Sequence, residues 1–122
     1  MDYFLYFYSM KNKRELYFFK TYFEEFYDNQ TDKVKNKILW TLRVIRELDQ
    51  IPEVYLKYIK NSSGLYEIRV QVGNNIFRVF CFFDVDNIVV IGHGFQKKSQ
   101  KTPKQQIEKA EQIKREYYES KE

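Results

Sequence analysis

Residues 64–103 constrain the fold most, because they predict three consecutive strands that lead into a basic segment. Residues 65–72 alternate between apolar and polar side chains, which is typical of a half-buried strand. Residues 76–83 are apolar except for Arg78, and residues 88–91 are entirely apolar. Short strands separated by polar turns predict an antiparallel meander.

The direction of the Arg78 side chain depends on the turn between the first two strands. Glu67 and Arg69 share the polar face of the first strand. A two-residue turn at residues 74–75 would place Arg78 on the same face, whereas a three-residue loop would bury an unpaired guanidinium in the core at high cost. We therefore expect an even-numbered turn, with Gln71 opposite Arg78.

The N-terminal half predicts one strand followed by a helical hairpin. Residues 3–8 (YFLYFY) are rich in strand-forming aromatics and predict a first strand inside the sheet. Residues 12–15 have the spacing of a capping box, and apolar residues then recur at helical steps as far as Tyr27. A second helix is expected to begin at an N-cap residue, Thr31, and to end before Pro52.

The C-terminal segment predicts one further helix. Thr102 suits the N-cap, Pro103 suits the first helical position and Gln105 suits the third. A narrow apolar stripe then runs as far as Tyr117, amid many charged residues. We expect this helix to pack one edge against the sheet and to fray after Tyr118.

Length and composition predict an ordinary globular protein. With 122 residues, 43% of them hydrophobic, residues 1–122 are expected to form a single domain. No apolar run approaches the roughly 20 residues of a membrane span, and the N-terminus lacks the pattern of a signal peptide. We therefore expect a cytoplasmic protein with no membrane partner. A single histidine and a single cysteine argue against a structural zinc site, and no cofactor is expected.

The basic character of the chain is concentrated in one segment. Residues 93–104 contain four lysines and no acidic residue, so they account for the whole formal net charge of +4. Such a concentration favours a site for a polyanion. Three further lysines do not share one face of the second predicted helix and are assigned to solvent: Lys33, Lys35 and Lys37.

Three motifs in order resemble the HigB branch of the RelE/ParE toxin superfamily, which is also described as phage-derived host-inhibition proteins. The motifs are residues 64–69 (GLYEIR), residues 76–79 (IFRV) and residues 94–103 (GFQKKSQKTP). The resemblance covers about residues 30–118. It implies an α+β fold in which an antiparallel sheet carries an N-terminal helical hairpin and a C-terminal helix, a RelE-like toxin fold.

The resemblance also implies a function. Relatives of this kind are ribosome-dependent endoribonucleases that cut mRNA on the ribosome without a metal, and a helix-turn-helix antitoxin protein holds them inactive. Arg69 and Arg78 match the arginines of the family's sheet, and Lys97 and Lys98 match its terminal basic pair. His93 lies where relatives place varied side chains. A different target, such as gyrase, remains open because the superfamily also contains gyrase-directed toxins.

Cleavage of RNA without a metal needs a base for the 2′-hydroxyl proton, cations for the phosphoryl oxygens and an acid for the departing 5′-oxygen. We assign Arg69 and Arg78 to the phosphate. The proton-transfer candidates are His93 and Glu67, and an unspecified lysine whose pKa is lowered by neighbouring cations is an alternative base. Lys97 is placed among the catalytic residues because, with Lys98, it would hold the RNA backbone and stabilise charge. Further contacts to RNA are predicted for five residues: Lys57, Lys60, Phe95, Lys98 and Lys101.

Other interpretations of the same residues stay open at this point. Glu67 and Arg69 would also suit a simple salt bridge, and Phe95 would suit the core. A protein with this fold that inhibits gyrase or the ribosome without cutting RNA is the main alternative. A nucleic-acid-binding repressor is less well supported, because no predicted helix carries a basic recognition face.

Overall fold

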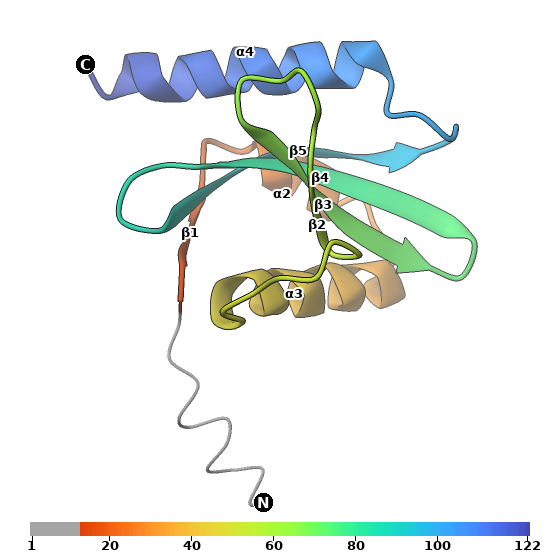
Figure 1. Ribbon diagram of the computed structural model, residues 1–122. Coiled ribbons are helices and arrows are strands. Elements are labelled where there is room, and N and C mark those ends of the chain that lie inside the picture. Colours follow the sequence, from red (N-terminus) through yellow and green to blue (C-terminus); the bar gives the residue numbers. More distant parts are fainter. Residues whose placement is uncertain (1–12) are drawn as a thin grey trace, which may run out of the picture.

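The computed structural model describes residues 13–122. The strand predicted at residues 3–8 lies outside the described residues. The fold is α+β, with one five-stranded sheet in the order β1-β5-β4-β3-β2 between two layers of helix (Figure 1). The elements are β1 Glu15–Phe18, α2 Tyr22–Tyr27, α3 Asp32–Glu47, β2 Leu56–Tyr58, β3 Leu65–Val72, β4 Asn75–Phe83, β5 Ile88–Lys97 and α4 Lys104–Ser120.

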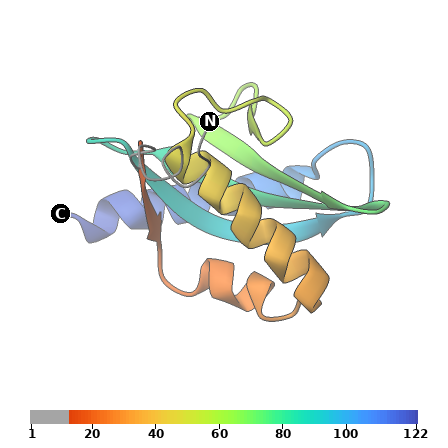
Figure 2. The same ribbon diagram turned by 90° about the horizontal axis from the view of Figure 1, so that it is seen from below.

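The two faces of the sheet carry separate apolar clusters. Helices α2 and α3 cover one face, and α4 crosses the other, as the view from below shows (Figure 2). On α3, Val34, Ile38, Leu42 and Ile45 are buried against the sheet. This helix confirms its prediction, since the Thr31 side chain accepts a hydrogen bond from the Val34 amide at 3.4 Å.

The predicted helix from residues 12–15 to Tyr27 is wrong in its first half. Residues 15–18 form β1, which pairs in parallel with β5, so the sheet is mixed rather than wholly antiparallel. The helical pattern is interrupted at Lys20, whose φ of 54° lies in the left-handed region. The helix that remains, α2, buries Phe23 and Phe26 against the sheet.

The meander of β3, β4 and β5 is formed, with one change of detail. The connection between β3 and β4 has two residues, as expected, but they are Gly73 and Asn74 rather than residues 74–75. Gly73 has a φ of 60°, a conformation that glycine adopts more easily than other residues. As a result, Arg69 rather than Gln71 lies opposite Arg78.

Strand β5 runs six residues further than the apolar run predicts, and it contains an irregularity. Its pairing with β4 shifts register between Val79 and Cys81. As a result of this shift, the consecutive residues Gly92 and His93 both face α4. A Cβ on Gly92 would lie 3.6 Å from Ile113 of α4, and His93 contacts Gln106 of the same helix.

Helix α4 packs Ala110, Ile113 and Tyr117 against the sheet, as predicted. Its start differs from the prediction by one residue, because Pro103 rather than Thr102 occupies the N-cap position. The helix continues to Ser120 rather than fraying after Tyr118. In the part of the chain from residue 13 onward, no helix is both long and apolar enough to cross a membrane.

We predict that Gly94→Ala destabilises the protein by roughly 1–3 kcal/mol, the usual cost of overpacking a core. A Cβ at Gly94 would lie 2.5 Å from Cδ2 of Phe26, so the buried ring would have to move. Urea unfolding measures the change. Gly92→Ala is the matched control, because its Cβ would meet neighbours no closer than 3.5 Å. Equal losses in the two variants would contradict this explanation.

Candidate functional site

Four charged side chains converge on the sheet face that α4 partly covers. Strand alternation places Glu67 and Arg69 of β3 on this face, and Arg78 of β4 joins them because it lies directly opposite Arg69. Lys97 comes from the end of β5, where it pairs with Ile76 and is therefore diagonal to Arg78. The predicted grouping of these residues on one face is confirmed.

The Glu67 carboxylate holds Arg78 in place. Its Oε2 atom lies 2.9 Å from Nε of Arg78, and both side chains are almost fully buried. Its Oε1 atom accepts a hydrogen bond from the Thr102 hydroxyl at 3.0 Å. The salt bridge therefore joins Glu67 to Arg78 and not to Arg69. With both oxygens engaged, Glu67 is better placed to orient Arg78 than to accept a proton from a substrate.

Arg69 and Arg78 repel each other across the two strands. Burial lowers the pKa of Arg78, and the charge of Arg69 lowers it further, while Glu67 opposes both effects. Nε of Arg69 is buried and has no hydrogen-bond partner among the described residues. Both arginines line a cavity of about 350 Å³, together with Lys37, Val54 and other residues. The site thus combines uncompensated positive charge with space beside it.

Lys97 has the lowered pKa that a lysine base requires. Burial is the largest cause, and the positive charges of Arg78 and Arg69 act in the same direction. Glu67 raises the pKa and offsets part of the effect. At a given pH, a larger fraction of Lys97 is therefore neutral than of a lysine exposed to solvent.

His93, a candidate for proton transfer, is buried, and its surroundings do not favour proton exchange at neutral pH. The side chain is 3% exposed, its Nε2 atom lies 2.9 Å from Oε1 of Gln106, and its ring stacks on Phe80. Burial lowers its pKa to about 4, and the charge of Lys109 contributes to the same shift. His93 instead connects β5 to the first turn of α4.

The predicted RNA contacts are not all brought together. Lys57 of β2 lies opposite Glu67, next to the site. Lys98 and Lys101 are exposed in the segment between β5 and α4. Phe95 is partly buried and stacks on Phe80, which agrees with the core interpretation. Lys60 lies in the turn that leads to Leu65, at the end of β3 remote from Arg69.

Two polar residues that position the site were missed by the sequence interpretation. Thr102 was assigned to a helix cap, yet its hydroxyl binds Glu67. Gln106 was not singled out, although it lies on the side of α4 that faces His93. Both contacts join residues that are not neighbours in the sequence, so local patterns do not reveal them. For Thr102, the only signal in the sequence is its place in the KTP motif of residues 101–103. Residues 13–122 contain no group of three or more His, Cys, Asp or Glu side chains suited to a metal ion.

Comparison with known protein families agrees with this arrangement. The family described as phage-derived protein Gp49-like (DUF891) matches residues 25–115, more than half of the chain and all four converging residues. The chain belongs to the Gp49-like family. This family is part of the RelE/ParE-like toxin-antitoxin superfamily, so its members are toxins with an antitoxin partner. No curated protein matches the chain. Assignment of this Gp49-like protein to the HigB branch stays a prediction.

We predict that His93 titrates with a pKa near 4, which NMR of its ring protons measures directly. The unfolded chain binds this proton near pH 6.5, so the stability associated with neutral His93 is fully present above pH 6.5 and is lost as the pH falls toward 4. The free energy of unfolding of His93→Phe should therefore change less with pH across this window. A ring that titrates above pH 6 would contradict the buried position.

Proposed function

We propose that this toxin is a HigB-like, ribosome-dependent endoribonuclease that cuts mRNA by attack of a 2′-hydroxyl on the adjacent phosphate. The observation that supports the proposal is the convergence of Arg69, Arg78 and Lys97 around one carboxylate. Like charges directly opposite one another on a sheet are destabilising by themselves. A bound phosphate relieves this repulsion, which gives the arrangement a use in binding RNA.

Each residue of the cluster has a separate task in the proposed reaction. Arg78 is oriented by Glu67 through Nε, and with Arg69 it donates hydrogen bonds to the non-bridging phosphate oxygens. Neutral Lys97 accepts the proton of the 2′-hydroxyl, and the resulting oxygen attacks phosphorus. The bond to the 5′-oxygen breaks, and that oxygen takes a proton from water. The products are a 2′,3′-cyclic phosphate and a free 5′-hydroxyl.

The surrounding lysines extend the binding surface. Lys57 lies beside Glu67, and Lys98 and Lys101 are exposed on the segment that precedes α4. These lysines would hold the RNA backbone on either side of the scissile bond, an interaction that weakens steeply with salt. In the proposed system the antitoxin partner is a helix-turn-helix protein, and the toxin acts in the cytoplasm.

Mapping of mRNA breaks in a purified translation reaction tests the proposal. The wild-type chain should produce breaks in phase with the codons, and Arg78→Ala should lower their rate by roughly 10²–10³-fold, as for loss of a group that stabilises transition-state charge. Arg69→Ala should act in the same direction. Lys60→Ala is the matched control and should retain full activity, because Lys60 lies at the remote end of β3.

Stalled translation with intact mRNA would contradict the nuclease and favour a non-catalytic inhibitor of the ribosome. Intact translation in the purified reaction, together with inhibited growth of cells that express the protein, would favour gyrase as the target. If Arg78→Ala cut mRNA at the wild-type rate, the assignment of the phosphate-binding arginines would be wrong even for an active nuclease.

The pH dependence of cleavage tests the role of Lys97. Its pKa is lowered from 10.5 but its base form still increases as the pH rises, so the single-turnover rate should increase with pH across the range in which ribosomes stay intact. Lys97→Arg keeps the positive charge and cannot lose its proton, so it should be slow and nearly independent of pH. A rate that rises equally with pH in Lys97→Arg would exclude Lys97 as the base.

A further inference from the structure

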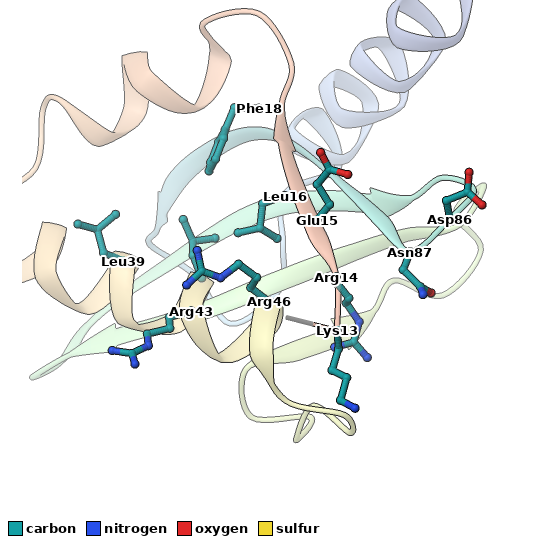
Figure 3. A pocket seen from close by; sticks show the side chains of 11 residues that line it. Lys13, Arg14, Glu15, Leu16, Phe18, Leu39, Arg43, Arg46, Asp86 and Asn87 are labelled. Atoms are coloured by element: carbon teal, nitrogen blue, oxygen red, sulfur yellow. The ribbon is translucent and has the colours of Figure 1, made fainter. Parts of the chain in front are cut away.

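A second cavity in the described part of the chain is separate from the candidate site. It is a groove of about 800 Å³ between β1 and the C-terminal half of α3 (Figure 3). The candidate site uses the ends of β3, β4 and β5 on the face toward α4. The groove lies at the β1 edge of the sheet, on the face toward α3, next to the start of β5. We call it the β1–α3 groove.

Among residues 13–122, nothing pairs with the outer edge of β1. Within residues 13–122, β5 is the only strand that pairs with β1, and β1 lies at the end of the sheet order. The amides of Glu15 and Phe19 donate to Asn87 and Ile91, at 3.1 and 3.2 Å. Because successive residues point to opposite sides, the amide and carbonyl groups of Leu16 and Phe18 face the open edge. An extended chain has hydrogen-bonding groups available there.

The side chains above this edge form an apolar surface. Leu16 and Phe18 of β1 and Leu39 of α3 border the groove (Figure 3). Leu42 of α3 also lines it. Leu39 is 49% exposed and Phe18 is 39% exposed, which is unusual for large apolar side chains that lie near each other. An occupant that covers them must itself be apolar on one side.

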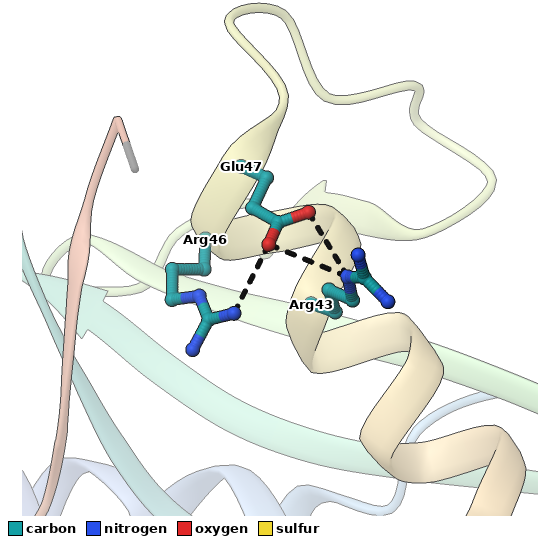
Figure 4. Close-up of polar contacts among 3 residues, drawn as sticks. All are labelled: Arg43, Arg46 and Glu47. Atoms are coloured by element: carbon teal, nitrogen blue, oxygen red, sulfur yellow. Dashed lines mark hydrogen bonds and ion pairs between the residues drawn. The ribbon is translucent and has the colours of Figure 1, made fainter. Parts of the chain in front are cut away.

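The rim of the groove on the α3 side is basic. Arg43 and Arg46 both contact the Glu47 carboxylate, at 3.1 and 3.0 Å (Figure 4). Nε of Arg46 has no hydrogen-bond partner in the described residues. Lys13 lies at the same opening. The acidic lining residues, Glu15 and Asp86, point away from α3 (Figure 3). The occupant should therefore carry carboxylates.

We propose that the β1–α3 groove binds an extended segment of a protein partner, in which every second residue is apolar or acidic and which pairs with the open edge of β1. Every second side chain of a strand paired with β1 would face α3, where both the apolar lining and the basic rim of the groove lie. The partner chemistry fits the antitoxin that the toxin family implies. The inference goes beyond the proposed nuclease, because no residue of the groove belongs to the Arg69 and Arg78 cluster.

The test uses the full chain and peptides selected for binding to it from a random 12-residue display library. The selected peptides should share apolar and acidic residues at every second position, and their affinity is measured by fluorescence anisotropy. Leu39→Glu and Arg43→Glu should each weaken binding at least tenfold. The matched controls are Trp40→Glu and Lys33→Glu, which make the same changes on other faces of α3 and should leave affinity unchanged. NMR amide exchange at Leu16 and Phe18 should slow when peptide binds.

Several results would overturn the proposal. Peptides that bind the groove variants as tightly as wild type, or that are basic, would place their site elsewhere. Slow exchange at Leu16 and Phe18 in the free chain, independent of concentration, would mean that the chain itself covers the edge. Slow exchange that appears only at high concentration would indicate a second copy. Preferential binding of a single-stranded RNA oligonucleotide, lost in Arg43→Glu, would assign the groove to RNA.

The outcome is independent of the nuclease proposal. Leu39→Glu and Arg43→Glu should leave codon-phased cleavage of mRNA intact, since the groove and the catalytic cluster lie on opposite faces of the sheet. Lost peptide binding with retained cleavage supports both proposals. Retained peptide binding with lost cleavage would contradict the groove and require a new account of the site.

Discussion

The register between β3 and β4 is the constraint on which the arrangement of charges depends. Side chains alternate along a strand, so a shift of one residue would move Arg78 to the face that packs on α3. In the observed register Arg78 meets Glu67, and Arg69 lies directly across from it. The two-residue turn at Gly73 therefore determines both which apolar side chains enter the core and which cations meet on the other face.

Much of the fold follows from local patterns in the sequence. The α3 stripe and its Thr31 cap, the alternation in β3 and the stripe of α4 each depend on neighbouring residues. Strand β1 cannot be predicted from neighbouring residues alone, because the spacing of Leu16 and Phe19 also fits a helix. Pairing with β5, more than 70 residues away in the sequence, decides between the two structures. Such distant pairing leaves little trace in a short segment.

The candidate site was predictable to a similar extent. Alternation and an even-numbered turn were sufficient to group Glu67, Arg69 and Arg78 on one face. His93 lies apart from these residues, because the register shift in β5 and the contact with a glutamine of α4 place its ring in the core. Lys60 lies apart from the cluster for a different reason, since closeness in sequence to Lys57 does not determine which end of a strand a turn occupies.

Arg14 affects which strand forms the edge of the sheet. Its guanidinium donates to three carbonyls at the end of α3, those of Ile45, Leu48 and Asp49, and so ties β1 to the helix. Strand β1 in turn covers the backbone of the most apolar part of β5. Without these contacts of Arg14, the hydrophobic strand β5 would become the edge strand of the sheet, and exposed hydrophobic edge strands promote aggregation. Arg14, which lies outside the residues that the family matches, therefore holds the strand that covers this apolar edge of β5.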